Sequence, residues 1–114
     1  MAQTSDTAPT EPIALSDAAA LDEHVADHDV VLADFYADWC GPCQMMEPAV
    51  EAIASDTDAA VLKVDVDRFQ SLAAEYGVQG VPTLFVFVDG EPADRMVGAQ
   101  TEAALRDAVT AHLD

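Results

Sequence analysis

Basic residues are scarce in this chain. Its 114 residues include four lysines and arginines against 22 aspartates and glutamates, which gives a formal net charge of −18 at pH 7. A surface of that sign repels the phosphates of DNA and RNA and the anionic headgroups of a membrane. We therefore expect no nucleic-acid partner and no membrane partner.

The acids recur along the whole chain between apolar positions, so they indicate an acidic surface around a folded core rather than an acidic tail. This pattern is typical of proteins from a high-salt cytoplasm. Mobile ions screen the repulsion between like charges there, because the Debye length falls to about 3 Å at 1 M salt. The composition thus predicts a halophilic protein whose fold loosens at low salt.

Long apolar runs are also absent: none approaches the roughly 20 residues that cross a bilayer. The first twelve residues carry no positive charge and no apolar stretch, so they do not form a secretory signal. We expect a cytoplasmic protein, in a compartment that keeps thiols reduced. Residues 1–12 are predicted to be a disordered lead-in, followed by one domain over residues 13–114.

Cysteine is limited to Cys40 and Cys43, and the chain has three histidines. A structural zinc site takes about four such ligands. His24 and His28 lie four apart on a predicted helix, but no third ligand is obvious, so we expect no metal. A structural disulfide across so short a loop adds little stability and is rare in a cytoplasm. The pair is therefore predicted to be a reversible dithiol/disulfide that needs no bound cofactor.

Apolar periodicity and turn residues predict alternating strands and helices. The predicted strands cover residues 13–15, 30–36, 60–66, 83–88 and 95–98, and the helices cover 16–28, 40–55, 68–76 and a final segment from Thr101. Ser16 and Thr101 are the predicted N-caps of the first and last helices, and Gly77 is expected to end the third. The order β-α-β-α-β-α-β-β-α predicts an α/β fold, a central mixed β-sheet with helices on both faces.

The two cysteines follow the strand that ends at Tyr36, so Cys40 is expected at the N-terminus of the next helix. Free N–H groups and the helix dipole favour a thiolate there, which makes Cys40 the predicted nucleophile. Pro42 fits the first helical turn. Cys43, one turn deeper, suits the resolving role, and Trp39 is expected to cover the sulfurs.

Asp34 and Lys63 interrupt two otherwise apolar strands. Each could be a strand-end residue that reaches solvent. Opposite charges on two central strands also suggest a pair beneath the cysteine loop. In that case burial raises the pKa of Asp34, which accepts the proton of Cys43, and Lys63 tunes it.

The chain resembles the thioredoxin family over residues 13–113. The resemblance rests on four stretches: ADFYADWCGPCQMMEP at 33–48, VDVD at 64–67, YGVQGVPTLFVFVDGE at 76–91 and VGA at 97–99. Departures are Gln44, where a lysine is common, and Tyr36, where tryptophan is frequent. Gln44 and the acidic surface both push the pKa of Cys40 upward.

The resemblance implies a thioredoxin fold and a cis peptide bond between Val81 and Pro82, which lies against the cysteines. The backbone of Val81 would pair with a substrate strand. The implied substrate groove is lined by Trp39, Gly41, Pro42, Val66, Val81, Pro82, Val97, Gly98 and Ala99.

The resemblance also implies a protein-disulfide reductase, a general electron donor that maintains redox homeostasis. Its partners would be target proteins with disulfides and a thioredoxin reductase linked to NADPH or ferredoxin, and the protein would be a monomer. Gly41 and Pro42 favour a reductant over the oxidase and isomerase relatives. A binding module with incidental thiols and a dedicated donor to one enzyme remain as alternatives.

Overall fold

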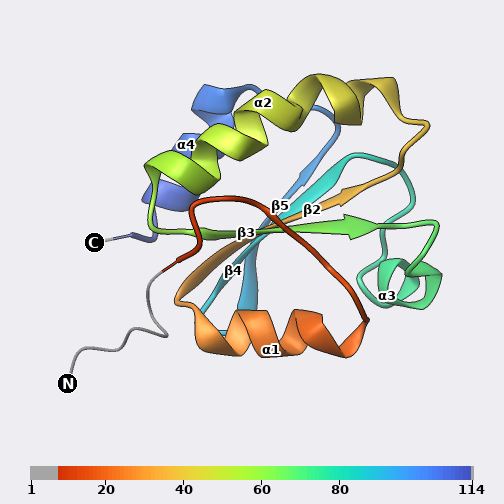
Figure 1. The fold of residues 1–114 in the computed structure, drawn as a ribbon, viewed down its shortest axis with the longest axis horizontal. Coiled ribbons are helices and arrows are strands. Elements are labelled where there is room, and N and C mark those ends of the chain that lie inside the picture. Colours follow the sequence, from red (N-terminus) through yellow and green to blue (C-terminus); the bar gives the residue numbers. More distant parts are fainter. Residues whose placement is uncertain (1–7, 114) are drawn as a thin grey trace.

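The computed structural model describes residues 8–113 of the chain. Its strands are β1 (Ile13–Ala14), β2 (Val30–Tyr36), β3 (Ala60–Asp65), β4 (Thr83–Val88) and β5 (Glu91–Val97), and its helices are α1 (Ala19–Asp27), α2 (Gly41–Asp56), α3 (Gln70–Glu75) and α4 (Glu102–Thr110). The strands form one sheet in the order β1-β3-β2-β4-β5 (Figure 1). β1, β3 and β2 are parallel, whereas β4 and β5 continue the sheet antiparallel. The predicted element order and mixed sheet are confirmed.

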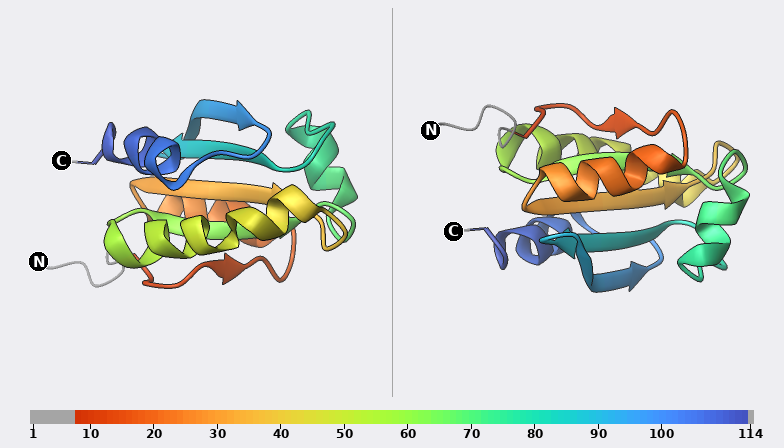
Figure 2. Two further views of the ribbon diagram at one scale, coloured as in Figure 1. Left: turned by 90° about the horizontal axis from the view of Figure 1, so that it is seen from above. Right: turned by 90° about the horizontal axis from the view of Figure 1, so that it is seen from below.

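Helices cover both faces of the sheet, as Figure 2 shows from opposite sides. Val31 and Phe35 of β2 pack with α1 and α3, whereas Val30 and Leu32 pack with α2 and α4. Side chains alternate between the faces along a strand, so Asp34 lies on the α2 side of β2. β2 is buried on both faces, which explains why its sequence is almost continuously apolar.

Two of the three predicted helix ends are confirmed. The Thr101 side chain accepts a hydrogen bond from the Ala104 amide at 3.1 Å. Gly77 has φ +69°, and the amides of Gly77 and Val78 donate to the carbonyls of Ala74 and Ala73. This pair of bonds is a Schellman motif, which requires the left-handed residue that glycine supplies.

The predicted Ser16 cap is wrong. α1 begins only at Ala19, and the carboxylate of Asp17 accepts the Ala20 amide at 3.1 Å. The Ser16 carbonyl accepts instead from Arg68, at 3.0 Å. Ser16 and Asp17 can both accept a hydrogen bond from the first turn of α1, and in the structure Asp17 accepts it.

The hairpin turn is Asp89-Gly90, and both residues have positive φ, 52° and 87°. That geometry matches the right-handed twist of the flanking strands. β5 is longer than the predicted 95–98, because the strand pairs from Glu91 although its side chains are mostly exposed. An exposed edge strand lacks the apolar pattern on which the prediction depended.

Part of the predicted lead-in, residues 1–7, lies outside the described residues. In the remainder, Ala8 is half-buried against the core that α1 covers. Among residues 8–113, no helix is both long and apolar enough to cross a membrane.

Candidate active site

The two cysteines lie where the central strand β2 gives way to helix α2. Cys40 is the N-cap residue of α2, with φ −90° and ψ 108°, and Cys43 belongs to the first turn. They form a disulfide with a Cα–Cα separation of 5.2 Å. The Cys43 amide donates to the Cys40 sulfur at 3.1 Å. In the reduced protein, the same N–H and the helix dipole would stabilise negative charge on the Cys40 sulfur.

Both sulfur-bearing residues are nearly covered, with 4% of Cys40 and 3% of Cys43 exposed. The side chains packed against them are those of Tyr36, Val66 and Val81. These come from the end of β2, the segment after β3 and the segment before β4. The redox pair therefore lies in an apolar setting just beyond the C-terminal end of the central strand β2.

Trp39 is 70% exposed, and its indole N–H donates to the Asp67 carboxylate at 2.8 Å. Asp67, in the segment after β3, therefore holds Trp39 beside the cysteines; it was not predicted as a site residue and stood only within the VDVD stretch. Its own amide donates to the carboxylate of Asp65 at 2.9 Å. The shielding of the sulfurs by Trp39 stays a prediction.

The segments expected to line a substrate groove are tied to one another. The Val81–Pro82 peptide bond is cis, and Pro82 is buried. The Gly98 amide donates to the Pro82 carbonyl at 2.8 Å, with Gly98 at φ +91°. This bond joins the segment before β4 to the segment after β5. Val66 and Val81 both pack on the cysteines, so the segment before β4 contacts the redox pair directly.

Large apolar side chains are exposed on this end of the molecule. Trp39 and Val97 are 70% and 65% exposed, and Met45 on α2 is 82% exposed. Gly41 and Pro42, between the cysteines, are exposed too. Exposed apolar side chains near a reactive cysteine pair are typical of a surface that binds another protein.

Asp34 is the buried carboxylate beneath α2, with 1% of its surface exposed. Its Oδ1 atom has no hydrogen-bond partner among the described residues. Burial raises the pKa of Asp34 from 3.8 to about 6; nearby Lys63 opposes this rise and Glu47 adds to it. A carboxyl group in such a setting keeps its proton to a higher pH than an exposed aspartate does.

Lys63 and Asp34 are direct neighbours in the β2–β3 register, but they are not each other's ion-pair partners. The Lys63 ammonium lies 3.2 Å from Glu47 Oε2 and 4.2 Å from the centroid of the Tyr36 ring. The direct ion pair of Lys63 is therefore with Glu47, a partly hydrated carboxylate that α2 supplies, and not with Asp34. The tuning of Asp34 by Lys63 stays a prediction. Glu47 was not predicted as a site residue, because only the packing of α2 on the sheet brings it to Lys63.

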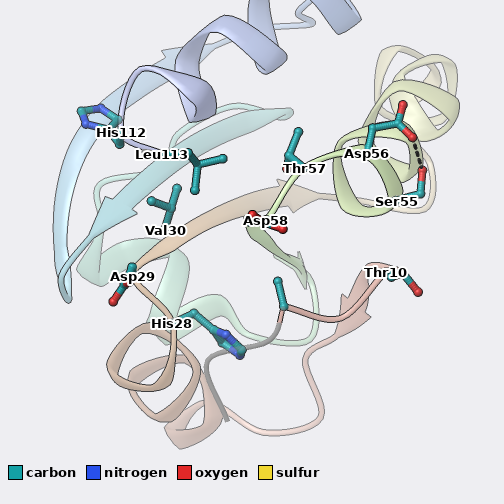
Figure 3. A pocket seen from close by; sticks show the side chains of 11 residues that line it. Thr10, His28, Asp29, Val30, Ser55, Asp56, Thr57, Asp58, His112 and Leu113 are labelled. Carbon is teal, nitrogen blue, oxygen red and sulfur yellow. Dashed lines mark hydrogen bonds between the residues drawn. The ribbon is translucent and has the colours of Figure 1, made fainter. Parts of the chain in front are cut away.

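A hollow of about 610 Å³ lies at the opposite end of the sheet (Figure 3). It is lined by residues from the start of β2, the end of α2 and the C-terminal segment, among them His28, Asp29, Asp56, Asp58 and His112. Helix α2 has 16 residues and a length of about 24 Å, so this hollow is remote from the cysteines. Within residues 8–113, no group of three His, Cys, Asp or Glu residues could hold a metal ion.

A mixed sheet with helices on both faces and a Cys-Gly-Pro-Cys disulfide at a helix N-terminus defines a thiol–disulfide oxidoreductase. The thioredoxin family model matches residues 12–111. Accordingly, the chain belongs to the thioredoxin family. The redox group of that family is the disulfide itself, here Cys40–Cys43, and the family carries no separate cofactor.

Individual relatives agree with this assignment. A mutant thioredoxin from Halobacterium salinarum has 55% identity and a TM-score of 0.91, over 94% of this chain and 95% of that one. A thioredoxin from Nicotiana alata has 34% identity and a TM-score of 0.82, over 93% and 96%. A Staphylococcus epidermidis thioredoxin is 50% identical over 86 residues, which are 74% of this chain and 83% of the relative. The predicted family and fold are confirmed.

Proposed function

We propose that this chain is a general protein-disulfide reductase of the cytoplasm, and the observation that carries the proposal is the position of the Cys40–Cys43 pair at the start of α2. The reduced Cys40 thiolate attacks one sulfur of a target disulfide. A bond forms between Cys40 and that sulfur, the target S–S bond breaks, and the other target sulfur leaves as a thiolate that takes a proton.

Cys43 then resolves the mixed disulfide. Its thiol loses a proton, its sulfur attacks Cys40, and the second target sulfur leaves as a thiolate. Two electrons have passed to the target, and the Cys40–Cys43 disulfide is formed. A dithiol of a thioredoxin reductase, fed by NADPH or ferredoxin, returns the two electrons.

Asp34 is the proposed acceptor of the Cys43 proton, with Lys63 tuning it. Its raised pKa of about 6 supports the role, since a base works best when its pKa lies near the working pH. The Oδ1 atom has no hydrogen-bond partner in the part of the chain that the structure describes, so it can take a proton without breaking such a bond. A buried carboxylate destabilises the fold, and a role in catalysis explains why the protein keeps one at this position.

The proposed docking surface is the groove implied by the family. Trp39, Val97 and the segment up to Ala99 would contact a target, and the backbone of Val81 would pair with an extended target strand. Gly41, Pro42, Val66, Pro82 and Gly98 would complete the lining. The apolar exposure of Trp39 and Val97 supports this assignment. We further propose that residues 13–114 act as a monomer.

Replacing single cysteines tests the proposal. Cys43→Ser should form stable mixed disulfides with a model target such as insulin, because Cys40 still attacks and nothing resolves the product. Cys40→Ser is the matched control and should form none. If Cys43→Ser traps no target and both variants bind partners as the wild type does, the thiols are incidental and the chain is a binding module.

A comparison of several disulfide substrates tests the range of targets. A general donor should reduce unrelated disulfide proteins at comparable rates. A strong preference for one substrate would indicate a dedicated donor instead.

A further inference from the structure

Lys63 is the one lysine of the chain, and two carboxylates compete for it. We propose that Glu47 is a positioning residue: it holds the Lys63 ammonium away from Asp34 and so leaves that carboxylate better able to take a proton. The catalytic consequence rests on the proposed role of Asp34. The positioning itself does not, and it can be measured separately.

The fold places the three groups together. Asp34 and Lys63 are register partners on neighbouring parallel strands, which run about 4.8 Å apart. Both side chains lie on the sheet face that α2 covers, because Val61 on β3 and Leu32 on β2 pack there and lie two residues away. A lysine has the length to reach a carboxylate on the adjacent strand. The ammonium is nevertheless 3.2 Å from Glu47, and Oδ1 of Asp34 has no hydrogen-bond partner within residues 8–113.

Hydration explains why Glu47 wins this competition. Its side chain is 48% exposed, whereas Asp34 is 1% exposed. An ammonium moved beside Asp34 would lose water, and desolvation of an ion pair offsets much of its attraction. A hollow of about 240 Å³ lined by Glu47, Lys63 and Glu51 keeps the observed pair near solvent. The Tyr36 ring holds the ammonium from a second side.

Two charged side chains act on the Asp34 carboxyl group. Lys63 from β3 lowers its pKa and Glu47 from α2 raises it. Cys40 and Cys43 of α2 carry no charge while they are in the disulfide. The oxidised protein is therefore the state in which the three-residue arrangement can be measured without interference from the thiols.

The first test is a ¹³C NMR titration of the Asp34 carboxyl carbon in oxidised protein. Glu47→Gln should move the midpoint from about 6 towards the ordinary value of 3.8, because Lys63 is released towards Asp34 and the charge of Glu47 is lost. Glu51→Gln is the matched control: it removes a carboxylate from the same hollow, one helical turn on, and should leave the midpoint in place. An unchanged midpoint in Glu47→Gln, or equal shifts in both variants, would overturn the proposal.

The second test separates positioning from the direct effect of the Glu47 charge. In a Lys63→Met background the ammonium is gone, so Glu47→Gln should shift the Asp34 midpoint less than it does in the wild type. A shift of equal size in the two backgrounds would refute the positioning role. Neither titration depends on whether Asp34 takes the Cys43 proton, so failure here is distinct from failure of the proposed mechanism.

The consequence for catalysis is read from the pH profile of mixed-disulfide resolution. If the titrations succeed, the profile of Glu47→Gln should move to lower pH together with the Asp34 midpoint. If the midpoint moves and the profile does not, the positioning stands and the catalytic role of Asp34 is refuted.

Discussion

Replacing Asp34 by Asn should remove a pH dependence from the stability of the oxidised protein. The folded state holds the Asp34 proton more tightly than the unfolded chain does, because burial raises its pKa from 3.8 to about 6. The stability gained from that proton is fully present below pH 3.8 and is lost as the pH rises through about 6. The difference between the two pKa values corresponds to about 3 kcal/mol in the free energy of unfolding. Asn cannot ionise, so the variant lacks this loss.

The assay is urea unfolding of the oxidised wild type and Asp34→Asn in molar KCl at a series of pH values. Burying the amide that replaces the Asp34 carboxyl group changes the stability of the variant by the same amount at every pH. That cost therefore cancels when the change in unfolding free energy with pH is compared between the two proteins. Relative to the variant, the wild type should lose about 3 kcal/mol between about pH 4 and pH 7 and nothing further above that. Asp29→Asn, an exposed site at the other end of β2, controls for the loss of one charge. A stability difference that stays flat with pH would refute the raised pKa of Asp34.

Three further predictions follow from the same structure. Asp34→Asn should slow the resolution of mixed disulfides by Cys43 with little change in fold, which stopped-flow kinetics would measure; unchanged turnover from about pH 6 to 9 would exclude Asp34 as the proton acceptor. Thr101→Ala should cost about 1 kcal/mol in urea unfolding, because the Ala104 amide loses its partner, and a loss near zero would show that water replaces the cap. Thermal unfolding in molar KCl should occur at a higher temperature than in dilute buffer, and equal temperatures would rule out the halophilic interpretation.

The sequence predicted the fold well because each element carried a local signal. The continuous apolar run of β2 and the Asp89-Gly90 turn need no knowledge of distant residues. Gly77 was identifiable for the same reason, since a helix that ends with a left-handed residue favours glycine. β5 was predicted too short because an exposed edge strand takes its stability from backbone pairing, which leaves little trace in side-chain pattern.

The candidate site could be predicted only in part. The cysteines stand out in the sequence by their chemistry, and Asp34 stands out because it interrupts an apolar strand. The partners of Lys63 and Trp39 do not, because both bonds are long-range: Glu47 and Asp67 are two acids among 22, and only helix packing and loop geometry select them. Where a surface is uniformly acidic, the choice of ion-pair partner is a tertiary property.

The central claim, that Cys40 and Cys43 form a reducing couple, is tested most directly by the reduction potential of that couple. Equilibration with a dithiol buffer in molar KCl would measure it. We expect a potential of about −270 mV, the value that thioredoxins in general have. A potential of about −180 mV or higher would contradict it and would mark the chain as a protein that forms or shuffles disulfides.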